Sequence, residues 1–150
     1  MGKEVRFTVL GNPQGKGRPR FKARYDPITQ KAFGKAHTPD NTVIYENLVK
    51  TEYAIQTSNF RFPDDAMLDM RILAFYSIPK STSKKKRNMM LDGIIRPTKK
   101  PDQDNVIKVI ADSLNQLAYR DDTQIVDCQC RKFYSEEPRV VVIIKQIGGE

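Results

Sequence analysis

Apolar and polar residues alternate along residues 3–10 and 124–134, and such alternation is typical of half-buried β-strands. Residues 67–78 form a long apolar stretch with Asp69 and Arg71 at alternate places. In the first stretch Val5, Phe7 and Val9 fall on one side, whereas Glu4 and Arg6 fall on the other. The last stretch is a β-prone run of valine and isoleucine, long enough for a central strand. Strands are predicted over residues 3–10, 67–78, 124–134 and 139–145. Because a turn at residues 136–138 joins the last two strands, we expect these two to form a hairpin.

A first helix is predicted over residues 38–56, with Thr38 as its N-cap and Pro39 in its first turn. Apolar residues recur there with roughly helical spacing. The face expected to be buried consists of Ile44, Leu48 and Ile55, with Tyr45, Val49 and Ala54 beside them.

A second helix is predicted over residues 104–118, because its apolar residues fall on one arc at 3.6 residues per turn. That arc consists of Val106, Val109, Ile110, Leu114 and Leu117. The opposite arc is polar and holds Asp104, Lys108, Asp112 and Asn115. A shorter helix is expected to begin at Ser83 and to stop at Gly93.

These elements predict one domain that spans residues 1–150, of the α/β (α+β) class, with a mixed β-sheet covered by two main helices. The length suits a single domain. We find no internal repeat and no low-complexity linker in the sequence.

The chain is strongly basic, with 26 lysines and arginines against 18 acids and a net charge of +8. Such a balance favours phosphate-rich partners, most often nucleic acid, although a solvated basic surface would have the same composition. The basic residues are concentrated in two segments. The first, at residues 14–24, has two glycines and a proline and is expected to be a loop that leads into a short hairpin near residues 25–27. The second segment spans residues 81–100 and leads directly into residues 101–105. The candidate DNA contacts of the two segments are Lys16, Arg18, Arg20, Lys84, Lys85, Lys86, Arg87, Lys99 and Lys100.

The N-terminus has no secretory signal, and no apolar stretch approaches the length of a membrane span. We therefore expect a cytoplasmic protein without a membrane partner.

Against this basic background, carboxylates gather in one part of the sequence. Asp102 and Asp104 stand one residue apart at the start of the second helix, and Asp122 follows just beyond its end. Clustered carboxylates repel one another unless a proton or a divalent cation offsets the charge, and hard oxygen ligands suit Mg²⁺ or Mn²⁺. Helix capping is a competing explanation for Asp102 and Asp104, and an ordinary surface ion pair with Asp104 is one for Lys108.

The extended pattern is far more specific than an isolated Asp-x-Asp. It comprises Lys100-Pro101-Asp102-Gln103-Asp104-Asn105 and Lys108, then Asp112-Ser113-Leu114, then Asp121-Asp122-Thr123-Gln124. This arrangement closely resembles the RusA family of Holliday-junction resolvases, and the Lys-Pro-Asp form resembles its Gram-positive and prophage branch. Gln103 replaces a more apolar residue common in that family, without an expected effect on chemistry.

The resemblance implies that Asp102, Asp104 and Asp122 bind Mg²⁺, for which Mn²⁺ can substitute, and that Lys108 assists catalysis. It also implies a homodimer that cleaves symmetric strands of a four-way DNA junction in recombination and repair, leaving 5′-phosphate ends. Two alternatives stay open at this stage. One is a non-catalytic DNA-binding module that uses only the basic segments, and the other is a metal-dependent nuclease without junction preference.

Overall fold

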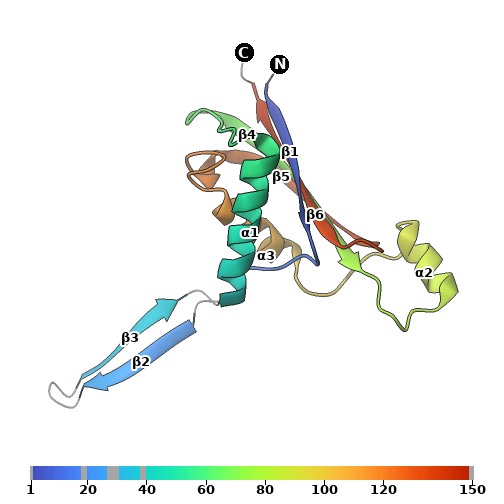
Figure 1. Ribbon diagram of the computed structural model, residues 1–150, viewed down its shortest axis with the longest axis horizontal. Helices are drawn as coiled ribbons and strands as arrows, with labels where there is room; N and C mark the ends of the chain where they lie inside the picture. The colour runs from blue at the N-terminus through green and yellow to red at the C-terminus, as the bar shows by residue number, and fades with distance from the viewer. Residues whose placement is uncertain (1, 18–19, 27–30, 38–39, 149–150) are drawn as a thin grey trace.

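The computed structural model describes residues 2–17, 20–26, 31–37 and 40–148. Within these residues the chain forms a four-stranded mixed sheet, three α-helices and a separate two-stranded hairpin (Figure 1). In chain order the elements are β1 (Glu4–Leu10), β2 (Arg20–Asp26), β3 (Lys31–His37), α1 (Asp40–Thr57), β4 (Met67–Ser77), α2 (Lys84–Leu91), α3 (Gln103–Ser113), a 3₁₀ turn η1 (Asp122–Gln124), β5 (Ile125–Ser135) and β6 (Arg139–Ile147).

The sheet has the order β1-β6-β4-β5, in which β4 and β5 are parallel and the other neighbours are antiparallel. The predicted hairpin of the last two strands is therefore wrong, because β4 lies between β5 and β6. Ile72 at the middle of β4 faces Val142 of β6 on one side and Cys130 of β5 on the other. The turn at residues 136–138 thus bridges a whole strand. A local turn signal does not reveal such a step, since consecutive strands are neighbours only in most cases.

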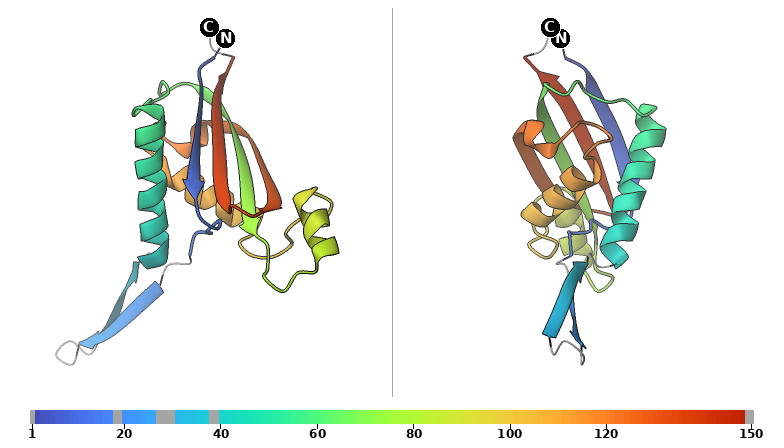
Figure 2. Two further views of the ribbon diagram at one scale, coloured as in Figure 1. Left: turned by 45° about the vertical axis from the view of Figure 1, so that its right-hand side comes forward. Right: turned by 90° about the vertical axis from the view of Figure 1, so that its left-hand side faces the viewer.

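Both long helices cover one face of this sheet (Figure 2), as the sequence predicted. The inward side chains of β1 and β4, among them Phe7 and Ile72, join Val49 and Tyr53 of α1 and Ile110 of α3 in one buried cluster. Burying this apolar surface is the main driving force that holds the helices on the sheet.

The buried face of α1 differs from the one expected. Tyr45, Val49 and Tyr53 are buried, whereas Ile44 and Ile55 are each 69% exposed. The sequence-based choice is right for Tyr45 and Val49 and wrong for Ile44, Leu48 and Ile55, because α1 has apolar residues on two sides and the side with the larger aromatic residues packs against the sheet. Tyr53 meets Phe7 edge-to-face, with ring centroids 5.3 Å apart. The expected cap and first turn at residues 38–39 lie outside the described residues.

The other two helices follow the sequence closely. In α2, the Ser83 hydroxyl accepts a hydrogen bond from the Lys86 N–H at 3.3 Å, so Ser83 is the N-cap that was predicted. In α3 the predicted arc is buried, but the helix ends at Ser113 rather than near residue 118. The Tyr119 hydroxyl donates to the Ala111 carbonyl, and Gln116 adopts a left-handed conformation with φ of 65°, so the chain folds back there.

The first basic segment is more ordered than a loop. From Arg20 onward it forms β2, which pairs with β3 in an antiparallel hairpin that projects away from the sheet (Figure 1). The two long strands correct the expectation of a short hairpin near residues 25–27. Across the described residues, helices are too short or too polar to cross a membrane.

Candidate active site

The segment that carries the first two acids is fastened to the sheet before α3 begins. The Tyr76 hydroxyl at the end of β4 donates to the Pro101 carbonyl at 2.5 Å, and the Gln103 amide donates to the Cys130 carbonyl of β5 at 2.7 Å. The Lys132 ammonium donates to the Lys99 carbonyl at 2.7 Å. These three bonds fix where α3 starts and therefore where its N-terminal acids lie.

Asp102 is the N-cap of α3, since its carboxylate accepts a hydrogen bond from the Asn105 N–H at 3.2 Å. The capping explanation therefore holds for this residue, and it leaves the remaining lone pairs of the carboxylate for another partner. Asp102 also lines an open pocket of about 740 Å³ with Gly15, Lys16 and Lys100.

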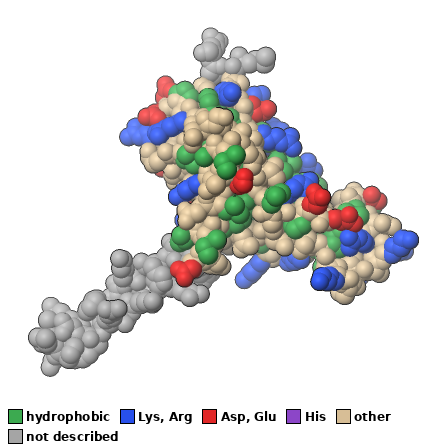
Figure 3. Space-filling view, viewed as in Figure 1, with side chains coloured by type: hydrophobic (Ala, Val, Ile, Leu, Met, Phe, Trp, Pro, Cys, Tyr) green, Lys and Arg blue, Asp and Glu red, His purple; other side chains and the backbone are tan. Residues whose placement is uncertain are grey.

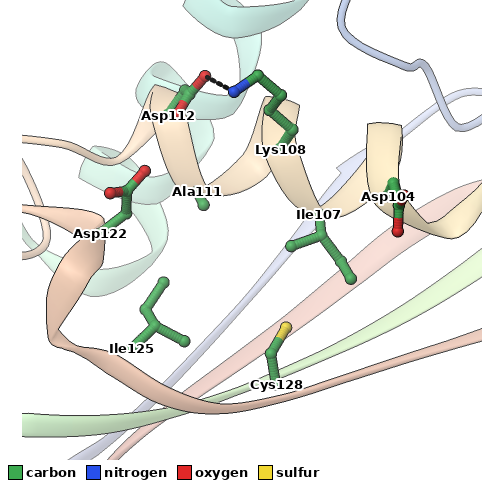
Figure 4. Close-up of a pocket in the computed structure, with 8 residues that line it drawn as sticks. All are labelled: Asp104, Ile107, Lys108, Ala111, Asp112, Asp122, Ile125 and Cys128. Atoms are coloured by element: carbon green, nitrogen blue, oxygen red, sulfur yellow. Dashed lines mark ion pairs between the residues drawn. The ribbon is translucent and has the colours of Figure 1, made fainter.

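Asp104 and Asp122 line a second pocket, of about 410 Å³, which lies between α3 and the start of β5 (Figure 4). Lys108 and Asp112 complete its polar rim, and its other lining residues are Ile107, Ala111, Ile125 and Cys128. In Figure 4 the Asp112 and Asp122 side chains lie next to each other at one end, whereas Asp104 lies at the other end.

Asp122 is held in place by the turn that precedes β5. Its backbone N–H donates to the Asn115 side-chain oxygen at 2.8 Å. Asp121 caps η1 by accepting from the Thr123 N–H. Hydrogen bonding with the Thr123 side chain, and then with its N–H, lowers the pKa of Asp121. The Gln124 amide donates to the Pro63 and Ala66 carbonyls, each at 3.0 Å, and so anchors the turn to the segment before β4.

The carboxyl group of Asp122 has a raised pKa. Partial burial is the largest cause, followed by a hydrogen bond with the Asp112 side chain and by the negative charges of Asp121 and Asp112. A carboxyl group with a raised pKa beside a second carboxylate indicates a place where a proton or a cation is stabilised.

Two lysines approach this acidic pair from different elements. The Lys16 ammonium, from the segment after β1, donates to Asp112 Oδ2 at 2.5 Å and lies 3.8 Å from Glu46 of α1. Its hydrogen bond with Asp112 is the largest cause of its raised pKa. Lys108 lies 3.9 Å from the same Asp112 oxygen, and its side chain is 62% exposed. Lys108 is therefore free to reach a ligand in the pocket, whereas the Lys16 ammonium is held by Asp112.

The structure places the predicted site residues in two adjoining pockets. Asp104, Lys108 and Asp122 line one of them and Asp102 lines the other. Asp104 and Asp112 are eight residues apart, about 12 Å along the helix axis. Across the described parts of the chain, three or more acids, cysteines or histidines do not gather closely enough to hold a metal ion. The convergence of Asp102, Asp104 and Asp122 on one ion stays a prediction.

Sequence reasoning left Asp112 out of the proposed site, although its spacing contained a signal. Asp112 is four residues after Lys108 and eight after Asp104, on the same polar arc of α3. Lys16 was expected at DNA, and the structure instead pairs its ammonium with Asp112 and Glu46. The contact between Lys16 and Asp112 could not be predicted from local sequence, because the two residues are 96 positions apart.

The donor chemistry of the pocket suits a divalent cation. Its acidic side chains offer carboxylate oxygens, which hard cations such as Mg²⁺ prefer, and Asp122 has a raised pKa that an added positive charge would lower. The fit is therefore good in donor type, and it is incomplete in the number of acids brought to one point.

Basic side chains gather over α2 and along the adjoining side of the molecule (Figure 3). The exposed residues of this basic surface are Lys84, Lys85, Lys86, Arg96, Lys99 and Lys100. Arg87 is half-buried and pairs with Glu136 at 2.8 Å. Of the other expected DNA contacts, Arg18 lies outside the described residues, and Arg20 is the first residue of β2.

Comparison with known proteins agrees with this geometry. Residues 11–145 match the family described as endodeoxyribonuclease RusA. The chain therefore belongs to the RusA family of endodeoxyribonucleases, and membership implies nuclease activity of the Holliday-junction-resolving kind. A relative from Bacillus subtilis (strain 168), described as uncharacterized protein YqaN, is 39% identical, and the match covers 97% of this chain and 98% of that protein.

Proposed function

We propose that this protein is a metal-dependent endodeoxyribonuclease that resolves four-way DNA junctions by paired cleavage of symmetric strands. The observation that carries the proposal is the pocket in which Asp104, Lys108 and Asp122 lie together. Family membership supplies the class of reaction. The pocket supplies acidic side chains and the Lys108 ammonium at a place where a phosphodiester could be attacked.

Each acid has a role in this proposal. Asp104 and Asp122, with Asp102 from the adjoining pocket, would hold Mg²⁺ or Mn²⁺. The bound ion would supply activation of water and neutralisation of charge on the phosphate. The hydrogen bond that the Asp122 backbone N–H donates to the Asn115 side-chain oxygen keeps that carboxylate at the pocket rim.

Lys108 is the residue best placed to meet the scissile phosphate. It lies one turn after Asp104 on the polar side of α3, and its side chain is 62% exposed. A fixed ammonium beside the reacting group stabilises the negative charge that develops there. The pair that it forms with Asp112 at 3.9 Å is loose enough to yield to a phosphate oxygen.

The basic surface over α2 would hold the arms of the junction. It is continuous in sequence with the motif, because Lys99 and Lys100 come directly before Pro101 and Asp102. Lysines there contact phosphates without reading sequence, so they contribute affinity and orientation.

The deciding experiment compares a synthetic four-way junction with a linear duplex of the same sequence, each with and without Mg²⁺. The proposal expects paired nicks in the junction only when Mg²⁺ is present, with 5′-phosphate ends that a ligase can seal. Equal cleavage of both substrates would point to a nuclease without junction preference. Tight Mg²⁺-independent binding without cleavage would point to a DNA-binding module.

We further propose that the active form is a homodimer, because two strands must be cut and the extended acidic motif occurs once in the sequence. The apolar stripe of α1 supports this. Ile44, Leu48 and Ile55, which are 69%, 40% and 69% exposed, lie along one side of the helix, where a second copy could cover them.

Subunit mixing tests the dimer. Wild-type and Asp104→Asn chains are combined and added to a supercoiled plasmid that extrudes a junction. A mixed dimer should cut one strand and stall, so nicked circles should accumulate at the expense of linear product. A monomer in sedimentation that still makes paired cuts would rule out this model.

A further inference from the structure

The segment between β1 and the hairpin, residues 13–17, lies directly against α3. The Lys16 N–H donates to the Asn105 carbonyl at 3.4 Å, and the Gly17 N–H donates to the Thr42 hydroxyl of α1 at 2.9 Å. A side chain at Gly15 would meet the Cβ atoms of Asn105 and Pro101 at 2.9 and 3.0 Å. The segment is therefore fitted closely to the first turn of α3 and to the start of α1.

From this segment the Lys16 side chain reaches Asp112, at the end of the pocket between α3 and β5 where Asp122 also lies. Its ammonium donates to Asp112 at 2.5 Å, and both side chains are largely withdrawn from solvent, at 23% and 21% exposure. Glu46 lies on the other side of the ammonium at 3.8 Å. An ion pair with a hydrogen bond at such a half-buried place restricts both partners more than an exposed pair does.

Asp112 in turn lies next to Asp122 at one end of the pocket between α3 and β5 (Figure 4). Lys16 therefore contacts the carboxylate that stands beside Asp122, although Lys16 comes from a different part of the chain.

We propose that Lys16 is a positioning residue, which fixes Asp112 beside Asp122 and thereby sets the geometry of that end of the pocket. Lys16 acts through Asp112, and its ammonium is committed to that carboxylate rather than to a DNA phosphate. The catalytic consequence rests on the proposed nuclease function, whereas the contact itself can be tested in the free protein.

The first test needs no DNA. Hydrogen exchange is measured at the Lys16 and Gly17 amides in the wild type, in Lys16→Met, in Asp112→Asn and in the control Lys50→Met, which removes an exposed lysine of α1. Both site variants should lose protection at these amides by about fivefold or more, and Lys50→Met should not. The double variant should lose no more than either single variant, because both changes remove the same contact. Unchanged protection, or losses that add, would overturn the proposal.

The second test uses cleavage of a saturating junction. Lys16→Met should lower the cleavage rate about ten- to a hundredfold, since small misplacements of reacting groups have effects of that size. Lys16→Arg should recover most of the rate, and the salt dependence of junction binding should not change.

Two results of the cleavage test would contradict the inference. A full cleavage rate combined with weaker binding and a shallower salt slope would make Lys16 a phosphate contact. A lower rate that Lys16→Arg does not restore, with a lower melting temperature, would make it a residue of general stability. If the wild type cleaves no DNA, the proposed function fails, and the exchange measurements still decide whether the contact exists.

Discussion

The helices α1 and α3 lie on the same face of the sheet, yet only α3 follows the pattern read from its sequence. In α3 the apolar residues occupy one arc and the polar residues the other, so just one orientation is possible. In α1 apolar residues occur on two sides, and the side with Tyr45, Val49 and Tyr53 is buried. The difference teaches that periodicity gives the orientation of a helix only when its opposite face is polar.

What decided the orientation of α1 was the surface that it covers. Val5, Phe7 and Val9 of β1 form a large apolar strip, and Tyr53 fills the space beside Phe7. Aromatic side chains bury more area than isoleucine or leucine, so placing them inside stabilises the fold more. Ile44 and Ile55 are then left facing outward, where they are available to a second molecule.

The sharpest test of α3 as the functional helix is Asp104→Asn, which keeps the shape of the side chain and removes its charge. Cleavage of the junction should fall by about 10³-fold or more, roughly 4 kcal/mol of activation free energy. Junction binding should survive or tighten, because repulsion of phosphate is relieved. The exposed Asp65→Asn serves as a matched control that should cleave normally. An Asp104→Asn protein with normal cleavage in Mg²⁺ would remove this acid from the site.

The same truncation in both helices tests their orientations directly. Ile110→Ala removes a fully buried side chain from α3 and should lower the free energy of unfolding by about 2–5 kcal/mol. In the dissociated monomer Ile44→Ala in α1 should change it by less than about 0.5 kcal/mol, because that side chain is 69% exposed in the single chain. Urea unfolding at two protein concentrations measures both. A loss in Ile44→Ala that is present at high protein concentration and disappears on dilution would support the α1 stripe as the dimer contact.

Lys108→Ala separates function from stability within α3. The exposed ion pair with Asp112 contributes roughly 0.3–0.5 kcal/mol at most, so the melting temperature should hardly move. Turnover should fall by about 10²-fold if the ammonium stabilises charge at the phosphate. Destabilisation with full activity per folded molecule would show that Lys108 has only a structural role.

The smallest predicted effect concerns stability without divalent ions: Asp122→Asn should give a modest rise in melting temperature. The pKa of Asp122 is raised in the folded state, so its charged form destabilises the fold once the pH exceeds that pKa. The difference between variant and wild type should vanish at acidic pH, below the ordinary pKa of aspartate, and reach its full size near neutral pH. Melting curves from acidic to neutral pH test this. A variant that is less stable than wild type at neutral pH would mean that Asp122 is not under electrostatic strain.

Much of the fold could be predicted from local pattern. The bounds of the strands, the Ser83 cap and the buried arc of α3 all depend on neighbouring residues and agree with the structure. Two non-local features could not be predicted in this way, namely the insertion of β4 between β5 and β6 and the buried face of α1. Both depend on which apolar surfaces meet, and the sequence pattern does not specify that.

The candidate site divides in the same way. Asp104, Lys108 and Asp122 could be chosen from spacing, and the structure brings them to one pocket. Lys16 could not be assigned to Asp112, because that contact exists only once α1, α3 and the segment before the hairpin have come together.

The hydrogen bond between Tyr76 and the Pro101 carbonyl has a consequence for how such a protein can diversify. It joins residues that are 25 positions apart, at the two ends of the basic segment that contains α2. That segment therefore behaves as an exchangeable module whose two ends meet at one point of the body. Doubling the length of a flexible loop costs only about 0.6 kcal/mol. Grafting a longer or differently charged segment between these two residues would change the charged surface beside the site, while the helix bearing the acids keeps its anchor.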